Sequence, residues 1–110
     1  MNLEHLTSYL PHNADLYVIK WLENHFITLK ITRRRETKLG DYRKLVENNR
    51  HQITVNGDLN QYAFFFVFTH EVAHLKTFVQ FDSRKINPHG KEWKTIFGHL
   101  LLESLHVYPE

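Results

Sequence analysis

The sequence predicts one α+β domain, in which a small three-stranded sheet packs against helices and a long apolar helix lies at the centre. Three observations lead to this fold class. The chain has 110 residues, the usual size of one compact domain with one core. Apolar residues recur with a helical period at both ends of the chain and with strand-like alternation between residues 26 and 56. Residues 59–81 contain neither proline nor glycine, which favours one uninterrupted helix.

Two short helices are expected before the sheet. Leu3–Leu10 forms the first, which ends at Pro11 because a proline ring cannot continue a helix. Ala14–Asn24 forms the second, with Asn13 as its N-cap. The second helix carries apolar residues that are expected to form its buried stripe: Leu16, Val18, Ile19, Trp21 and Leu22.

Three strands are expected in the middle of the chain. The first covers HFITLKIT at residues 25–32, and Arg33–Arg35 follow it as a charged turn or a strand extension. The second covers KLGDYRKLV at residues 38–46, where Gly40 indicates a bulge or bend. The third covers HQITVN at residues 51–56. This third strand is either an edge that pairs with an extended substrate or an interior strand of the sheet.

The central helix is expected to run from Leu59 to about Phe81. Its N-cap is either Asp58, which forms a capping box with Gln61, or Asn60. Residues 64–68 are all apolar, and a helix that is apolar on every side is expected to be buried.

A final helix follows a loop at residues 82–87. Asn87 is expected to cap this helix, with Pro88 in its first turn, where a missing N–H has no cost. Apolar residues recur at helical spacing as far as Leu105, which predicts that the helix packs on the core.

The central helix contains the sequence HEVAH. Histidines four residues apart lie one turn apart on the same face, so His70 and His74 can both bind one cation, at zinc–nitrogen distances of about 2.0–2.1 Å. Glu71 is rotated by about 100° from His70 and can reach a water beside the metal as a general base. The alternative is that these residues of a chain with nine histidines face solvent or bond to the backbone. A shared cation avoids the cost of burying them unpaired.

A catalytic zinc usually has three protein ligands and keeps its fourth position for water. We expect His89, in the segment INPHGKEW, to be the third ligand. It follows His74 by 15 residues, which leaves room for a loop and a second helix and excludes the metzincin pattern. Glu92 is the competing third ligand, because some zinc enzymes use a carboxylate there. His99 is expected to be structural.

The composition excludes several classes of protein. Without cysteine, the chain can have no thiolate catalysis, disulfide or cysteine-ligated zinc site. A formal net charge of +2 is too small to indicate an anionic partner by itself. The N-terminus does not have the pattern of a secretory signal, and the longest apolar run, residues 63–68, is too short to cross a bilayer. A cytoplasmic protein without a membrane partner is therefore expected.

Four segments together carry a family resemblance. HEVAH, the later NPHGKEWK with its apolar helix, LGDYR around Gly40, and ITVN before the central helix resemble the SprT-like family of zinc metallopeptidases, which includes the Spartan proteases. The resemblance covers residues 14–105, which is nearly the whole chain.

The resemblance implies a zincin-like minimal metalloprotease domain over residues 1–110. It implies Zn²⁺ bound by His70, His74 and His89, with Glu71 as the catalytic base of a zinc metalloendopeptidase that cuts protein substrates. Spartan relatives cut proteins crosslinked to DNA, so DNA or nucleoprotein is a candidate partner. Many family members carry a cysteine-rich zinc ribbon after the domain, and this cysteine-free chain has no such ribbon.

Several alternatives stay open at this point. A metal-stabilised module that binds protein or nucleoprotein would have no need of Glu71, whereas a peptidase would. A metallopeptidase directed at one repressor partner is a third interpretation. Tyr42, Arg84 and Lys91 are candidate donors to the oxyanion of the reaction. The arginines at positions 33–35 either contact phosphates or form a solvated turn.

Overall fold

The computed structural model describes residues 6–33, 35, 37–46, 50–82 and 84–109. Its elements in chain order are α2 (Ala14–Leu22), β1 (Ile27–Thr32), β2 (Gly40–Lys44), β3 (His51–Asn56), α3 (Gln61–Gln80), α4 (Lys91–Glu103) and a 3-10 turn, η1 (Leu105–Val107). The predicted α+β class with a three-stranded sheet is therefore confirmed. The helix expected over Leu3–Leu10 lies partly outside the described residues; Leu6 and Thr7 are helical.

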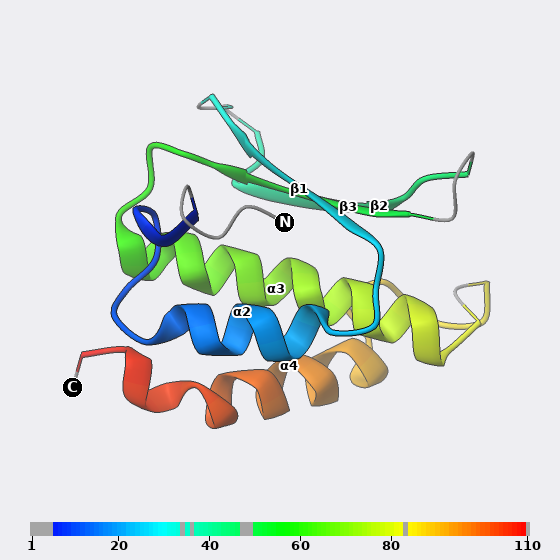
Figure 1. The fold of residues 1–110 in the computed structure, drawn as a ribbon. Helices are drawn as coiled ribbons and strands as arrows, with labels where there is room; N and C mark the ends of the chain where they lie inside the picture. The colour runs from blue at the N-terminus through cyan, green and yellow to red at the C-terminus, as the bar shows by residue number, and fades with distance from the viewer. Residues whose placement is uncertain (1–5, 34, 36, 47–49, 83, 110) are drawn as a thin grey trace.

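The elements form layers, with the sheet on one side of α3 and with α2 and α4 on the other (Figure 1). Helix α3 contacts β2 and β3 through one face and α4 through another. Ile53 and Val55 of β3 and Phe64 and Phe68 of α3 are fully buried where sheet and helix meet. Within the described part of the chain, no helix combines the length and the apolar character needed to cross a membrane.

The sheet has the order β1-β3-β2, so β3 is its central strand. Strand β3 pairs with β1 in parallel and with β2 antiparallel. The interpretation of residues 51–56 as a substrate-binding edge is therefore wrong, and the interior alternative is correct. Strand order depends on pairings between distant segments, which the alternation within one strand does not reveal. The strand at the edge beside α3 is β2.

Helix α2 buries a stripe that differs in part from the one expected. Val18, Trp21 and Leu22 are buried as expected, and Ala14 joins them, whereas Leu16 and Ile19 are 60% and 49% exposed. The buried positions repeat at intervals of three or four, which is the helical period. Asn13 precedes the helix with a φ of 70°, and its side chain makes no capping hydrogen bond.

The structure decides between the two N-caps offered for α3 and corrects the N-cap expected for α4. Asn60 caps α3, because its Oδ1 accepts a hydrogen bond from the Ala63 N–H at 2.9 Å, and Asp58 does not have this role. Gly90, rather than Asn87, is the N-cap of α4. The carbonyl of Asn87 instead accepts a hydrogen bond from the Gly90 N–H at 3.0 Å. This turn places His89 in the connection just before α4.

Candidate metal centre

Three histidines from two separate segments meet beside α3. His70 and His74 lie on α3, and His89 lies in the turn before α4. The Nε2 atoms of His70 and His74 are 3.2 Å apart, and His89 Nε2 lies 2.9 Å from that of His74 and 3.3 Å from that of His70. The helical spacing thus brings two imidazoles together, and the packing of α4 on α3 brings the third.

The spacing of these nitrogen atoms fits a zinc ion. With zinc–nitrogen bonds of about 2.0–2.1 Å in a tetrahedral site, two ligand nitrogens are about 3.3 Å apart. The observed separations of 2.9–3.3 Å are close to this value. Three neutral imidazoles cannot satisfy one another at a shared point, because each ring has only one N–H to donate. A cation at the centre of the triad would accept the lone pairs of all three nitrogens.

The environment of the triad favours the neutral form that binds a metal. Burial, followed by the neighbouring His70 and His89, lowers the pKa of His74 to about 4. Burial and then His89 lower the pKa of His70 as well. Imidazole must lose its proton to coordinate a metal, so protons do not compete strongly for these two residues near neutral pH.

Aromatic rings from α4 hold the histidines in place. The Trp93 ring lies 4.8 Å from that of His70, 5.3 Å from that of His74 and 4.8 Å from that of His89. Its Nε1–H also donates to the carbonyl of His70 at 3.4 Å. Phe97, one turn later, stacks on Trp93 at 4.8 Å. Trp93 is buried, so it supports all three imidazoles from the first turn of α4.

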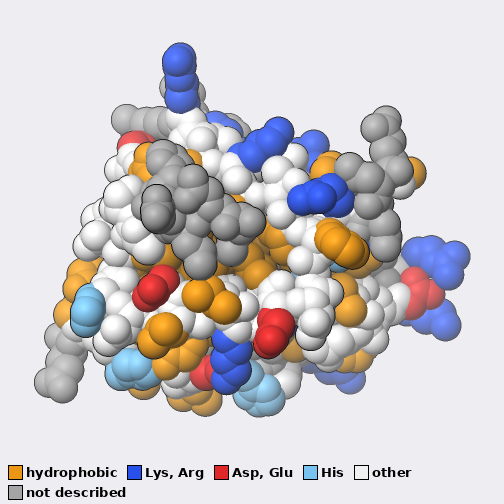
Figure 2. All heavy atoms as spheres, in the orientation of Figure 1, with side chains coloured by type: hydrophobic (Ala, Val, Ile, Leu, Met, Phe, Trp, Pro, Cys, Tyr) orange, Lys and Arg blue, Asp and Glu red, His pale blue; other side chains and the backbone are white. Residues whose placement is uncertain are grey.

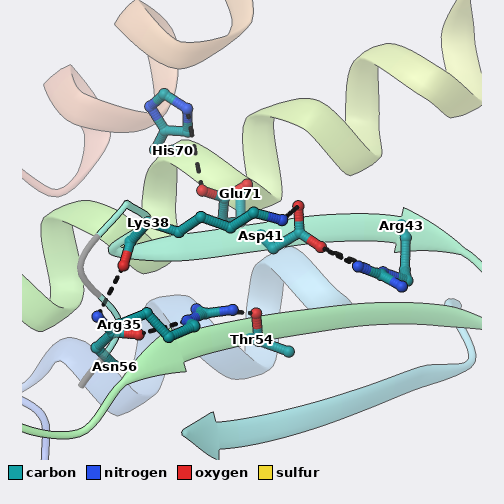
Figure 3. A network of polar contacts seen from close by, with 8 residues as sticks. All are labelled: Arg35, Lys38, Asp41, Arg43, Thr54, Asn56, His70 and Glu71. Atoms are coloured by element: carbon teal, nitrogen blue, oxygen red, sulfur yellow. Dashed lines mark hydrogen bonds and ion pairs between the residues drawn. The ribbon is translucent and has the colours of Figure 1, made fainter. Parts of the chain in front are cut away.

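Glu71 lies directly beside the triad. Its Oε2 is 3.9 Å from His70 Nε2 (Figure 3). Because the pKa of His70 is lowered, this contact involves a neutral imidazole and is not an ion pair at neutral pH. Burial, with a smaller contribution from Asp41, raises the pKa of Glu71 to about 7, against the opposing effects of Arg35 and Lys38. A carboxyl group with such a pKa can both accept and return a proton near neutral pH.

Strand β2 and the segment before it supply the charges around Glu71 (Figure 3). Asp41 pairs with Lys38 at 3.6 Å and with Arg43 at 3.0 Å. The buried side chain of Asn56 ties this segment to β3, since it accepts from Arg35 Nε and donates to the Lys38 carbonyl, both at 2.8 Å. No role beside Glu71 was expected for Lys38 or Asp41, and Arg35 was expected only in a charged turn or a phosphate contact. The only local signal is the pair of opposite charges that flanks Leu39 and Gly40.

A family model described as the SprT-like family matches residues 10–103. The chain belongs to the SprT-like family. The resemblance inferred from the motifs is thereby confirmed, and the match includes all four candidate site residues: His70, Glu71, His74 and His89. No curated protein and no solved structure matches the chain significantly.

Gly40 of this SprT-like domain has a different role from the one expected. It pairs regularly with Val55 in the β2–β3 ladder, so the predicted bulge or bend is wrong. A Cβ atom at this position would lie 2.6 Å from Val67 Cγ1, 2.9 Å from the Thr54 carbonyl oxygen and 3.2 Å from Glu71 Oε2. Glycine is required here because β2 passes in contact with the helix at the level of Glu71.

The other candidates of the SprT-like chain are not members of the triad, although Tyr42 lines a small pocket together with His74. Among the described residues, the group that could hold a metal contains His89 but not Glu92. The Tyr42 hydroxyl lies 2.7 Å from His51 Nδ1, and Arg84 pairs with Asp82 in the loop after α3. Lys91 is exposed at the start of α4.

Proposed function

We propose that this SprT-like domain is a zinc-dependent metallopeptidase, of zincin-like arrangement, that hydrolyses peptide bonds in protein substrates. The observation that carries the proposal is the convergence of three imidazole Nε2 atoms within 3.3 Å of one another, with the buried Glu71 beside them. A purely structural metal site has no need of such a carboxylate. The family match is compatible with this activity.

His70, His74 and His89 would hold the zinc through their Nε2 atoms. Bound there, zinc supplies a Lewis acid that polarises a carbonyl and lowers the pKa of a water to about 7. Glu71 accepts the proton of the attacking water and transfers it to the amine nitrogen as the peptide bond breaks. Its pKa of about 7 suits both directions of this transfer.

The free edge of β2 supports binding of an extended substrate. Within the described residues, β2 pairs with β3 alone, so its other edge has no neighbouring strand. At Gly40 this strand passes next to Glu71. A peptide that adds to the edge of β2 would therefore run past the triad with its own backbone hydrogen-bonded to the sheet.

Metal analysis combined with a casein cleavage assay tests the proposal. Glu71→Gln is expected to keep its zinc and to lose activity by about 10²–10⁴-fold, the usual contribution of general acid–base catalysis. His89→Ala is expected to lose zinc, whereas the matched control Glu92→Ala keeps it. Full zinc occupancy in His89→Ala would contradict the third ligand, and activity in Glu71→Gln would contradict the general base. Bound zinc without any cleavage would favour a metal-stabilised binding module.

The open face of the sheet supports a second proposal, contact with DNA or nucleoprotein. The strand register places Lys30 and Arg43 on the face opposite the buried Ile53 and Val55, and Arg33 is exposed after β1. No helix covers this face in Figure 1, and Lys and Arg side chains gather on the sheet side of the molecule in Figure 2. Such a basic surface is suited to a phosphate backbone.

Charge-reversal variants test the DNA contact. Lys30→Glu combined with Arg43→Glu is expected to weaken binding of duplex DNA and to reduce the salt dependence by about one unit of slope per contact removed. Lys85→Glu combined with Lys94→Glu makes the same change in net charge on other exposed elements. An equal loss of affinity in both double variants would contradict a specific contact at the sheet.

A further inference from the structure

A pocket opens directly beside the proposed metal site. It has a volume of about 300 Å³, and two members of the proposed site share its lining with apolar residues: Leu39, Gly40, Phe66, Val67, His70 and Glu71. This volume is at the lower end of the range of about 300–1,000 Å³ for ligand pockets. The pocket therefore suits one side chain or another small group.

Phe66 is left open at this pocket although its neighbours on α3 are buried. Phe64, Phe65 and Phe68 are 0% exposed, whereas Phe66 is 43% exposed and Leu39, across the pocket, is 54% exposed. Contact with a ligand would remove the remaining apolar surface of these side chains from water, which is favourable. Two large apolar side chains thus remain available to a ligand at the one place where α3 and the start of β2 flank Glu71.

The walls of the pocket are fixed before any ligand arrives. The Leu39 carbonyl accepts a hydrogen bond from the Asn56 N–H at 2.9 Å, and the Lys38 carbonyl accepts one from Asn56 Nδ2 at 2.8 Å. The Phe66 ring rests edge-on against Phe97 at 5.5 Å. A preformed pocket costs little ordering free energy when a ligand binds.

We propose that this pocket receives an apolar side chain of the substrate residue that adjoins the cleaved peptide bond. This inference rests on the proposed peptidase function. His70 and Glu71 border the pocket, so a peptide whose carbonyl lies at the triad presents an adjacent side chain to Leu39 and Phe66. The lining accepts Leu, Met or Phe, and the carboxyl group of Glu71 disfavours Asp and Glu. The substrate class is therefore peptide segments with an apolar residue next to the cleaved bond.

Quenched fluorescent peptides that carry Leu, Ala or Asp at each position around the cleaved bond test this assignment. Wild type is expected to cleave the Leu peptide with a kcat/KM about 10–100-fold above the Ala peptide at one adjoining position. Leu39→Ala and Phe66→Ala should each lower this Leu/Ala ratio by about fivefold or more. Leu39→Trp, which fills the pocket, should lower the Leu/Ala ratio as well. Leu102→Ala, at a residue 72% exposed on α4, is the matched control and should keep the wild-type ratio.

The outcomes separate the pocket from the peptidase proposal. Cleavage by wild type without an apolar preference, or a wild-type ratio in both alanine variants, overturns the pocket and leaves the peptidase standing. If zinc-loaded wild type cleaves no peptide, the proposed function fails, and binding of fluorescein-labelled Leu and Ala peptides then decides the pocket by itself. Tighter binding of the Leu peptide that is lost in Leu39→Ala and Phe66→Ala supports it, and equal binding of both peptides overturns it. Circular dichroism and zinc content establish that each variant is folded.

Discussion

The three histidines of the candidate metal site and His51 of the central strand have different partners in this SprT-like chain. His70, His74 and His89 direct their Nε2 atoms at one point, with separations of 2.9–3.3 Å. His51, on the central strand, has a protein partner instead, because its Nδ1 lies 2.7 Å from the Tyr42 hydroxyl. His51, His70 and His74 are at least partly buried, whereas His89 is exposed, and burial lowers the pKa of His51 as it does that of His70 and His74.

The comparison shows that a candidate metal site is distinguished by imidazole nitrogens that meet at one point. Burial of the histidines, or the number of histidines in the chain, does not distinguish it. A buried histidine with a hydroxyl partner has its hydrogen bond satisfied by the protein. Three imidazoles that share one point lack such a solution among themselves and gain one from a cation. The pKa of His51 is lowered as are those of His70 and His74, so a lowered pKa does not distinguish a metal ligand from a histidine with a protein partner.

The largest expected effect comes from removing one member of each group. His74→Ala should weaken zinc binding by more than about 100-fold, because even the loss of a group that only supports a ligand costs about 10–100-fold. His51→Ala should leave zinc affinity unchanged and lower the free energy of unfolding through loss of its contact with Tyr42. Competition with a chromophoric zinc chelator measures the affinities, and urea titration measures the stabilities. Equal zinc affinity in His74→Ala and His51→Ala would contradict the assignment of His74, but not His51, as a zinc ligand.

A smaller effect is expected from the ring that supports the triad. Trp93→Phe removes the Nε1–H bond to the His70 carbonyl and part of the ring surface against all three histidines, so zinc affinity should fall by about tenfold. Trp21→Phe is the matched control, since Trp21 is also buried but stacks on Phe65, away from the triad. Isothermal titration with zinc compares the two variants. A similar loss in both would mean that the effect arises from general destabilisation.

The smallest expected effect is the pH dependence due to His51. Burial first, and then Lys44 and His25, lowers its pKa in the folded state below the ordinary value of 6.5. The unfolded chain therefore binds more protons at acid pH, and stability is lost as the pH falls from about 6.5 through the folded-state pKa. Urea unfolding of zinc-free protein at pH 7.5 and 5.5 should show a smaller loss for His51→Gln than for wild type. An identical loss in both proteins would assign the pH dependence to other groups.

Local geometry made part of the site predictable. The spacing of His70, Glu71 and His74 fixes their relation on any helix, and the need for a third ligand pointed to His89, which the structure places within 3.3 Å of both histidine partners. The strand order was not predictable in this way, because the pairing of β3 between β1 and β2 joins segments that are distant in the sequence.

The exposure of Phe66 on α3 could not be predicted from the sequence for a related reason. A run of five apolar residues at positions 64–68 predicts burial on every side, and nothing in it marks Phe66 as the residue left exposed. The position of β2 in the tertiary structure determines which residues of α3 the sheet covers. Gly40 gave a signal of unusual backbone, but its cause, contact with Val67 and Glu71, requires the tertiary structure.

The position of His89 also has a consequence for the connection between α3 and α4. His74 and His89 are 15 residues apart, and the described residues between the two helices are largely exposed. A metal that joins them acts as a crosslink, and a covalent crosslink that closes a loop of this length contributes about 3 kcal/mol in the chain-entropy model. Removal of such a metal would release that closure first, so the described residues 81, 82 and 84–88 would become the local opening where proteases nick the chain and amide hydrogens exchange before the core of α3 does.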